Sequence, residues 1–278
     1  MRSNIKHLVA MLLLASYCHA TTVVVVITPQ AIYVGADGKH TSGGPIAHSR
    51  PITKAVIFQK RLIVACLGIC RMSLPSERTN KADVFDFTEW IGDVEKKAPA
   101  NVSVSDLTSL LERESSVTFN DFKVEDFIGA GAFDGQRPQK NFVDFVVLGY
   151  DAGVPTVNRV KYEIDWSKRR LILRILNDHP RPDTGRDFDF FILGESVTLV
   201  NDVKNRESNT YKELVALVPN VVPKLAAMQP LSHDEATSLC LAVLKIQTKH
   251  LKNIGPPYSI TITVPLGAGE ATQVIFPK

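Results

Sequence analysis

The sequence predicts an α+β fold in which two β-sheets pack face to face between layers of helices. Hydrophobic periodicity places the elements in the order strands, two helices, strands, two helices, strands. Strands do not alternate singly with helices, which argues against a doubly wound parallel sheet. The 278 residues are 45% hydrophobic and 22% charged, a composition typical of a globular chain that buries a large core.

The first twenty residues have the pattern of a secretory leader. Arg2 and Lys6 give a positive start, residues 8–15 an apolar centre, and Ala20 a small residue at the end. The apolar centre is too short to span a bilayer. We therefore expect a signal peptide over residues 1–20 and one domain over residues 21–278, in a secreted or periplasmic protein without a membrane span after leader removal.

Four strands are expected in the first third of the mature chain. A β-branched run beginning at Thr22 is followed by a turn at Pro29-Gln30 and a second apolar run. After a loop over residues 38–51, the pattern repeats around a turn at Gln59-Lys60. The expected strands cover residues 22–27, 31–36, 55–58 and 62–67.

The remaining elements follow the same alternation of strand groups and helix pairs. A helix is predicted over residues 81–97 from an apolar stripe at Val84, Phe87, Ile91 and Val94, and another begins after Ser105. Ser232 and Glu235 form a capping box for a late helix. Further strands are expected at 142–150, 157–164, 171–176, 188–193, 258–264 and 272–276. A turn at Asp151-Ala152-Gly153 follows the first of them, and a helical region is expected at 197–217.

Charge and cysteine usage exclude several functions. The formal charge of +3 falls to about +1 without Arg2 and Lys6, too balanced to favour nucleic acid as a partner. Cysteines 66, 70 and 240 remain after leader removal, an odd number that does not build a disulfide framework, so buried free thiols are expected. The sequence contains no cluster of metal-ligand spacing, and we expect neither metal nor cofactor.

Removal of the leader would make Thr21 the N-terminal residue. A threonine hydroxyl beside its own α-amino group can serve as nucleophile and base together, because that amine titrates at about 7.7–8.0. The second strand returns Asp37 to the edge of the sheet near Thr21, and Lys54 stands where it could reach both. Gly68, after the fourth strand, could offer a backbone N–H to an oxyanion.

These residues resemble the catalytic β-type subunits of the proteasome, a family of N-terminal nucleophile (Ntn) hydrolases. The resemblance rests on Thr21-Thr22, Gly35-Ala36-Asp37, Lys54 before an apolar strand, and Ala65-Cys66-Leu67-Gly68. It implies a four-layer αββα sandwich, Thr21 as nucleophile and base, an Asp37–Lys54 charge pair, and Gly68 as oxyanion donor. The resemblance is close over about the first fifty mature residues and looser afterwards.

The resemblance also implies roles for residues outside this group. Ser196, in Leu193-Gly194-Glu195-Ser196, would help to bind the threonine amine. A substrate-binding pocket would be lined by His40, Ile52, Val56, Cys66 and Cys70. The family carries an aspartate and a serine before its late strand, where this chain has Lys-Asn-Ile-Gly-Pro-Pro at 252–257, so support of the amine differs here.

The sequence thus favours an exported threonine hydrolase that cleaves peptide or other amide bonds through an acyl-enzyme intermediate. Two alternatives stay open: an inactive secreted protein that uses the sandwich for binding or assembly, and a different amidase acting on a small metabolite. The expected partners are a peptide or small amide substrate and further copies of the chain, since related enzymes form rings.

Overall fold

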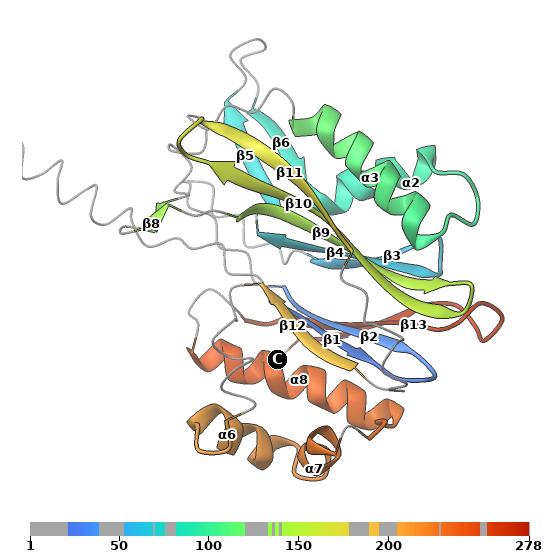
Figure 1. Cartoon of the computed structure of the whole chain (residues 1–278), viewed down its shortest axis with the longest axis vertical. Helices are drawn as coiled ribbons and strands as arrows, with labels where there is room; N and C mark the ends of the chain where they lie inside the picture. Colours follow the sequence, from blue (N-terminus) through green and yellow to red (C-terminus); the bar gives the residue numbers. More distant parts are fainter. Residues whose placement is uncertain are drawn as a thin grey trace, which may run out of the picture.

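The computed structural model of the chain describes residues 22–38, 53–68, 70–75, 82–119, 133–134, 137–138, 141–177, 189–194, 205–227, 229–250 and 255–277. Its main body consists of two five-stranded antiparallel sheets that face each other (Figure 1). Two short hairpins accompany them: β5 (Arg71–Pro75) with β6 (Ala82–Asp86), and β7 (Phe133–Asp134) with β8 (Arg137–Pro138). The predicted signal peptide lies outside the described residues.

The first sheet has the strand order β12-β1-β2-β13-β14. Strands β1 and β2 form a hairpin whose turn is closed by Thr28, which accepts a hydrogen bond from the Ala31 N–H at its side-chain oxygen. The register places Val23 opposite Ala36, so Asp37 lies beside the start of β1. The strands are β1 (Thr22–Ile27), β2 (Ile32–Asp37), β12 (Asp189–Gly194), β13 (Tyr258–Thr263) and β14 (Thr272–Phe276).

The second sheet has the order β11-β10-β9-β4-β3. The turn at Gln59-Lys60 joins β3 to β4 with both residues at positive φ, and Ala152-Gly153 joins β9 to β10 in the same way. Both turns are predicted from the sequence, and the structure confirms them. The strands are β3 (Ala55–Phe58), β4 (Leu62–Gly68), β9 (Asn141–Asp151), β10 (Val154–Asp165) and β11 (Arg170–Asn177).

The helices lie on the outer sides of the sheets (Figure 1). Helix α8 (His233–His250) packs on β1, β2 and β13, and α6 (Asn209–Leu217) packs on α8 with α7 (Val221–Ala226) beside it. On the second sheet, α3 (Val104–Phe119) packs on β9 and β10, with α2 (Phe87–Lys97) against α3.

Helix starts are defined by side-chain caps. The predicted capping box of α8 is confirmed, because the Ser232 N–H donates to Glu235 (2.8 Å) and the Glu235 N–H donates to the Ser232 hydroxyl (3.3 Å). The first N–H of α3, at Val104, donates instead to Asp151 at the end of β9 (2.8 Å). This cap ties α3 to the sheet on which it packs.

Three apolar clusters hold the layers together. Aliphatic side chains fill the space between the sheets, with Val23 and Val25 of β1 facing Ala65 and Leu67 of β4. The alternate residues Val24 and Val26 face α8 in a second cluster. Because both faces of β1 are covered, its sequence is a continuous apolar run rather than an alternating one.

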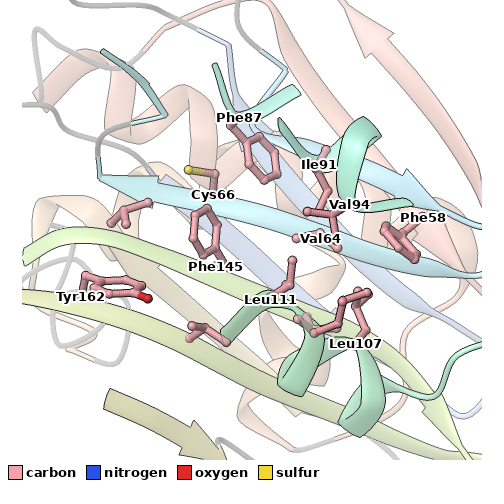
Figure 2. Packing of buried hydrophobic residues seen from close by; sticks show 14 of the residues in the cluster. Phe58, Val64, Cys66, Phe87, Ile91, Val94, Leu107, Leu111, Phe145 and Tyr162 are labelled. Carbon is pink, nitrogen blue, oxygen red and sulfur yellow. The ribbon is translucent and has the colours of Figure 1, made fainter. Parts of the chain in front are cut away.

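The third cluster lies between the second sheet and helices α2 and α3. Phe145 is at its centre. The Phe145 ring stacks on the rings of Trp90 and Phe87, with 4.8 Å and 6.1 Å between ring centroids. Figure 2 shows Cys66 and Phe145 beside Phe87 in this cluster, and Leu107 and Leu111 of α3 on its lower side.

The four-layer αββα sandwich predicted from the family resemblance is wrong: the architecture is an α+β fold of two antiparallel sheets with few helices. The prediction treated each helix pair in the sequence as a layer on a sheet. In the structure α6 packs on α8 rather than on the strands, and the segment before α2 joins a hairpin.

The helix predicted over residues 81–97 is shorter than expected. Residues 82–86 form β6, and α2 begins at Phe87 because Asp86 accepts hydrogen bonds from the N–H groups of Thr88 (2.9 Å) and Glu89 (3.4 Å). The helical stripe included Val84, yet pairing of β6 with β5 decides its conformation. Helix α6 likewise begins only at Asn209, and residues 197–204 of the predicted helical region lie outside the described residues.

Candidate active site

Six of the predicted site residues lie in the described part of the chain. Asp37 is the last residue of β2, Lys54 precedes β3 and Val56 lies in β3. Cys66 lies in β4, Gly68 is the last residue of β4, and Cys70 lies between β4 and β5. Thr21, His40, Ile52 and Ser196 lie outside the described residues.

Asp37 and Lys54 meet although Asp37 ends a strand of the first sheet and Lys54 precedes a strand of the second. The Lys54 Nζ donates to Asp37 Oδ2 at 2.8 Å, and the two side chains are 5% and 0% exposed. The backbone explains this reach, because the Lys54 carbonyl accepts from the Cys66 N–H (2.8 Å) and so holds the residue against the end of β4. The ion pair thus bridges the facing sheets at one end.

The second oxygen of Asp37 accepts from the backbone of β1. The Thr22 N–H donates to Asp37 Oδ1 at 3.1 Å. Thr22 directly follows Thr21, so the carboxylate bridges the lysine ammonium and the peptide N–H next to the predicted nucleophile. The sequence analysis did not predict the Thr22 N–H as part of the site. The antiparallel pairing of β1 with β2, which brings Thr22 beside Asp37, could have indicated it.

Burial changes the pKa of the Asp37 carboxylate. Loss of hydration raises the pKa of Asp37, and the Lys54 ammonium and the Thr22 N–H offset part of that rise. A buried ionised pair needs close hydrogen bonds to each partner to offset its loss of hydration. Here both carboxylate oxygens have such a donor.

The end of β2 is anchored on its other side by the segment before β13. The Gly38 N–H donates to the Pro257 carbonyl at 2.7 Å, and Tyr258 pairs with Asp37 in the ladder. The sequence shows residues 252–257 only as a departure from the family pattern. The structure gives Pro257 the role of holding the end of β2 through the Gly38 N–H.

The backbone at position 68 requires a glycine on steric grounds. Its φ is +81°, and a Cβ at this position would lie 2.5 Å from the Phe142 carbonyl oxygen of β9. The close approach of β9 therefore explains this glycine without any catalytic role. Its function as oxyanion donor stays a prediction.

Three residues predicted to bind substrate lie together in the cluster beneath α2 and α3. Cys66 and Cys70 are buried members of that cluster, and the partly buried Val56 packs against it. They are thus on the helix-covered side of the second sheet, away from the cluster between the sheets. Their substrate-binding role stays a prediction.

The described residues provide neither a metal-ligand cluster nor a membrane-spanning helix. Within the described ranges, no three histidine, cysteine or acidic side chains gather in a way that could ligate a metal ion. None of the described helices combines the length and apolar character required to cross a bilayer.

The fold is similar to that of solved structures of other proteins. The chain is similar to Anbu (ancestral beta-subunit) from Yersinia bercovieri, with 13% identity, 93% of this chain and 88% of that chain covered, and a TM-score of 0.50. It is also similar to the Anbu complex from Pseudomonas aeruginosa, a helical assembly, with 14% identity, coverage of 93% and 87%, and a TM-score of 0.52.

These comparisons correct the family assignment made from the sequence. No family model matches the chain. No curated protein matches it. Assignment to the proteasome β-type subunits is therefore wrong, and what the solved structures support is a likeness of fold to Anbu at low identity.

Proposed function

We propose that this protein is an exported threonine hydrolase in which Thr21, freed by removal of residues 1–20, attacks an amide carbonyl. The observation that carries the proposal is the buried Asp37–Lys54 pair, whose carboxylate also binds the N–H of the residue after Thr21. A fold similar to Anbu supports a hydrolase at a coarse level.

The chemistry assigns a separate task to each group. The free amine of Thr21 accepts the proton of its own hydroxyl, and the alkoxide attacks the carbonyl carbon to form an acyl-enzyme ester that water releases. The positive charge of Lys54 favours the neutral amine and the developing oxyanion. Asp37 positions Lys54 through their hydrogen bond (2.8 Å), and the Gly68 N–H completes the proposed oxyanion site.

Peptides and small amides are the proposed substrates, because the reacting centre requires only an amide carbonyl. Self-association is part of the proposal, supported by the helical assembly of the Pseudomonas aeruginosa Anbu complex. Light scattering of the purified protein tests it, and a monomer at every concentration would contradict it.

The central test is the state of the N-terminus. Sequencing the exported protein should give Thr-Thr-Val, and a retained leader or another first residue contradicts this mechanism, because Thr21 then has no free amine. A threonine-directed electrophile should label the mature protein on Thr21.

Substitutions make the labelling test specific. Thr21→Ala should abolish labelling, whereas Thr21→Ser should retain part of it. Thr272→Ala, at an exposed threonine of β14, is the matched control and should be labelled like the wild type. Equal labelling of the Thr21→Ala variant would refute the assignment, and a correctly processed wild type that is never labelled would favour the inactive binding protein.

A further inference from the structure

Strand β14 is an open edge of the first sheet. It pairs with β13 on one side, and no described strand pairs with its other side. An edge of this kind presents a row of unpaired backbone N–H and C=O groups to any strand that approaches it. Two of the large apolar side chains exposed in the structure lie on this strand, Val274 at 48% and Ile275 at 59%.

The inner side of β14 is fixed by hydrogen bonds. The Gln273 amide donates to the Ala55 carbonyl of β3 (2.7 Å) and to the Thr261 hydroxyl of β13 (2.8 Å). Because side chains alternate along a strand, Val274 points to the opposite face, on the side of α8, where Phe276 packs. The backbone of β14 is thus in place before a partner arrives, so pairing along it requires little additional ordering.

The other edges of the two large sheets are protected against pairing. Charged side chains commonly give edge strands this protection. Strand β11 carries Arg170 and Arg174, and β12 begins with Asp189. Strand β3 is partly covered, since its Ala55 carbonyl already accepts a hydrogen bond from β14. Residues 272–276 contain neither a charge nor a proline, so β14 is the described edge that is both open and uncharged.

We propose that β14 pairs antiparallel with β14 of a second copy of the chain, about a two-fold axis at Val274. This surface is then the interface of the self-association proposed above, on which the inference rests. An interface about a two-fold axis uses the same surface on both copies and closes at a dimer. The first sheets of the two copies would join into one continuous sheet.

The sequence of β14 complements itself in this register. Val274 lies opposite its own copy, Thr272 opposite Phe276, and Gln273 opposite Ile275. Pairs of β-branched residues, and of an aromatic with a β-branched residue, stabilise neighbouring strands, whereas like charges directly opposite destabilise them. Since the paired residues carry no charge, a second copy fits this edge without repulsion.

Cross-linking of the purified full chain tests the register. Val274→Cys sets two thiols opposite each other with about 4.5–5.5 Å between Cβ atoms, so mild oxidation should produce a covalent dimer that a thiol reductant separates. Thr272→Cys is the matched control, because the two new thiols would lie about 13 Å apart along the paired strands. It should cross-link no more than the wild type, and equal cross-linking of both cysteine variants would overturn the register.

Sedimentation over a range of concentrations tests the interface without a cross-link. Val274→Lys sets two ammonium groups opposite each other at the centre of the pairing, so the Kd of the dimer should rise by about tenfold or more. Ile175→Lys is the matched control, because Ile175 is 41% exposed on the edge strand β11, and this variant should dimerise like the wild type. Circular dichroism should give both lysine variants the spectrum of the wild type.

The two experiments separate this surface from self-association itself. If the Val274→Lys variant assembles like the wild type and the Val274→Cys variant does not cross-link, the β14 interface is overturned and self-association stands. A wild type that stays monomeric, with no cross-link through Val274→Cys, overturns both and leaves the edge to an extended segment of another protein. Neither result bears on hydrolysis, which the labelling of Thr21 tests.

Discussion

The buried pair of Asp37 and Lys54 makes a quantitative prediction for the Lys54→Met variant. Methionine keeps most of the volume of the lysine side chain but removes the ammonium that lies 2.8 Å from Asp37 Oδ2. The Asp37 side chain is 0% exposed, so no water replaces the lost donor. Only the Thr22 N–H still binds the carboxylate in the described residues of the variant.

Removal of one partner of a buried pair leaves a charge without compensation and costs about 3–5 kcal/mol. That is a large fraction of the 5–15 kcal/mol by which domains are usually stable, so the loss should be easy to measure. The double variant Asp37→Asn, Lys54→Met removes both charges and should recover most of it.

The loss of stability in the Lys54→Met variant should depend on pH, and the direction of this dependence follows from the pKa of Asp37. Burial raises the pKa of Asp37 and Lys54 lowers it, so the Lys54→Met variant has a still higher folded-state pKa. Between the unfolded and folded pKa values the folded state binds more protons, so the free energy of unfolding falls as pH rises. The deficit of the variant should therefore be greatest at neutral pH and shrink towards the ordinary carboxyl pKa of about 3.9.

Urea unfolding at a series of pH values measures both effects. Lys60→Met is the matched control, because the Lys60–Glu270 pair is 75% and 67% exposed, and its loss should leave stability unchanged. A Lys54→Met variant that loses less than about 1 kcal/mol at neutral pH, the range of an exposed pair, would refute the reasoning. So would a deficit that stays constant down to acidic pH.

Three other predictions concern stability, each measured by the same unfolding assay. Phe145→Ala, in the aromatic cluster against Trp90, should cost about 3–5 kcal/mol, and a loss under 1 kcal/mol would mean that the cluster is not tightly packed. Thr22→Val should stabilise by about 1 kcal/mol, since the Thr22 hydroxyl is buried without a partner among the described residues; destabilisation would reveal a partner for it. Asp86→Ala should cost about 1 kcal/mol by removing the α2 cap, and no change would assign the helix start to packing alone.

Part of the fold was predictable because its signals are local. The turns at Gln59-Lys60 and Ala152-Gly153 and the capping box of Ser232 depend on adjacent residues, and the structure has all three. The start of α2 was not predictable from the stripe that includes Val84, because pairing of β6 with β5 competes with helix formation. The position of α6 on α8 rather than on a sheet is likewise a matter of long-range packing.

By itself the sequence determined the apolar runs that become strands, the helix caps and the residue types of the candidate site. Those properties depend on neighbours a few positions away. The resemblance already implied the Asp37–Lys54 pair. Only the tertiary structure decided that the Thr22 N–H shares the Asp37 carboxylate and that the Phe142 carbonyl requires a glycine at position 68. These contacts join residues distant in the chain, and the pairing of strands within each sheet, which no local pattern encodes, brings them together.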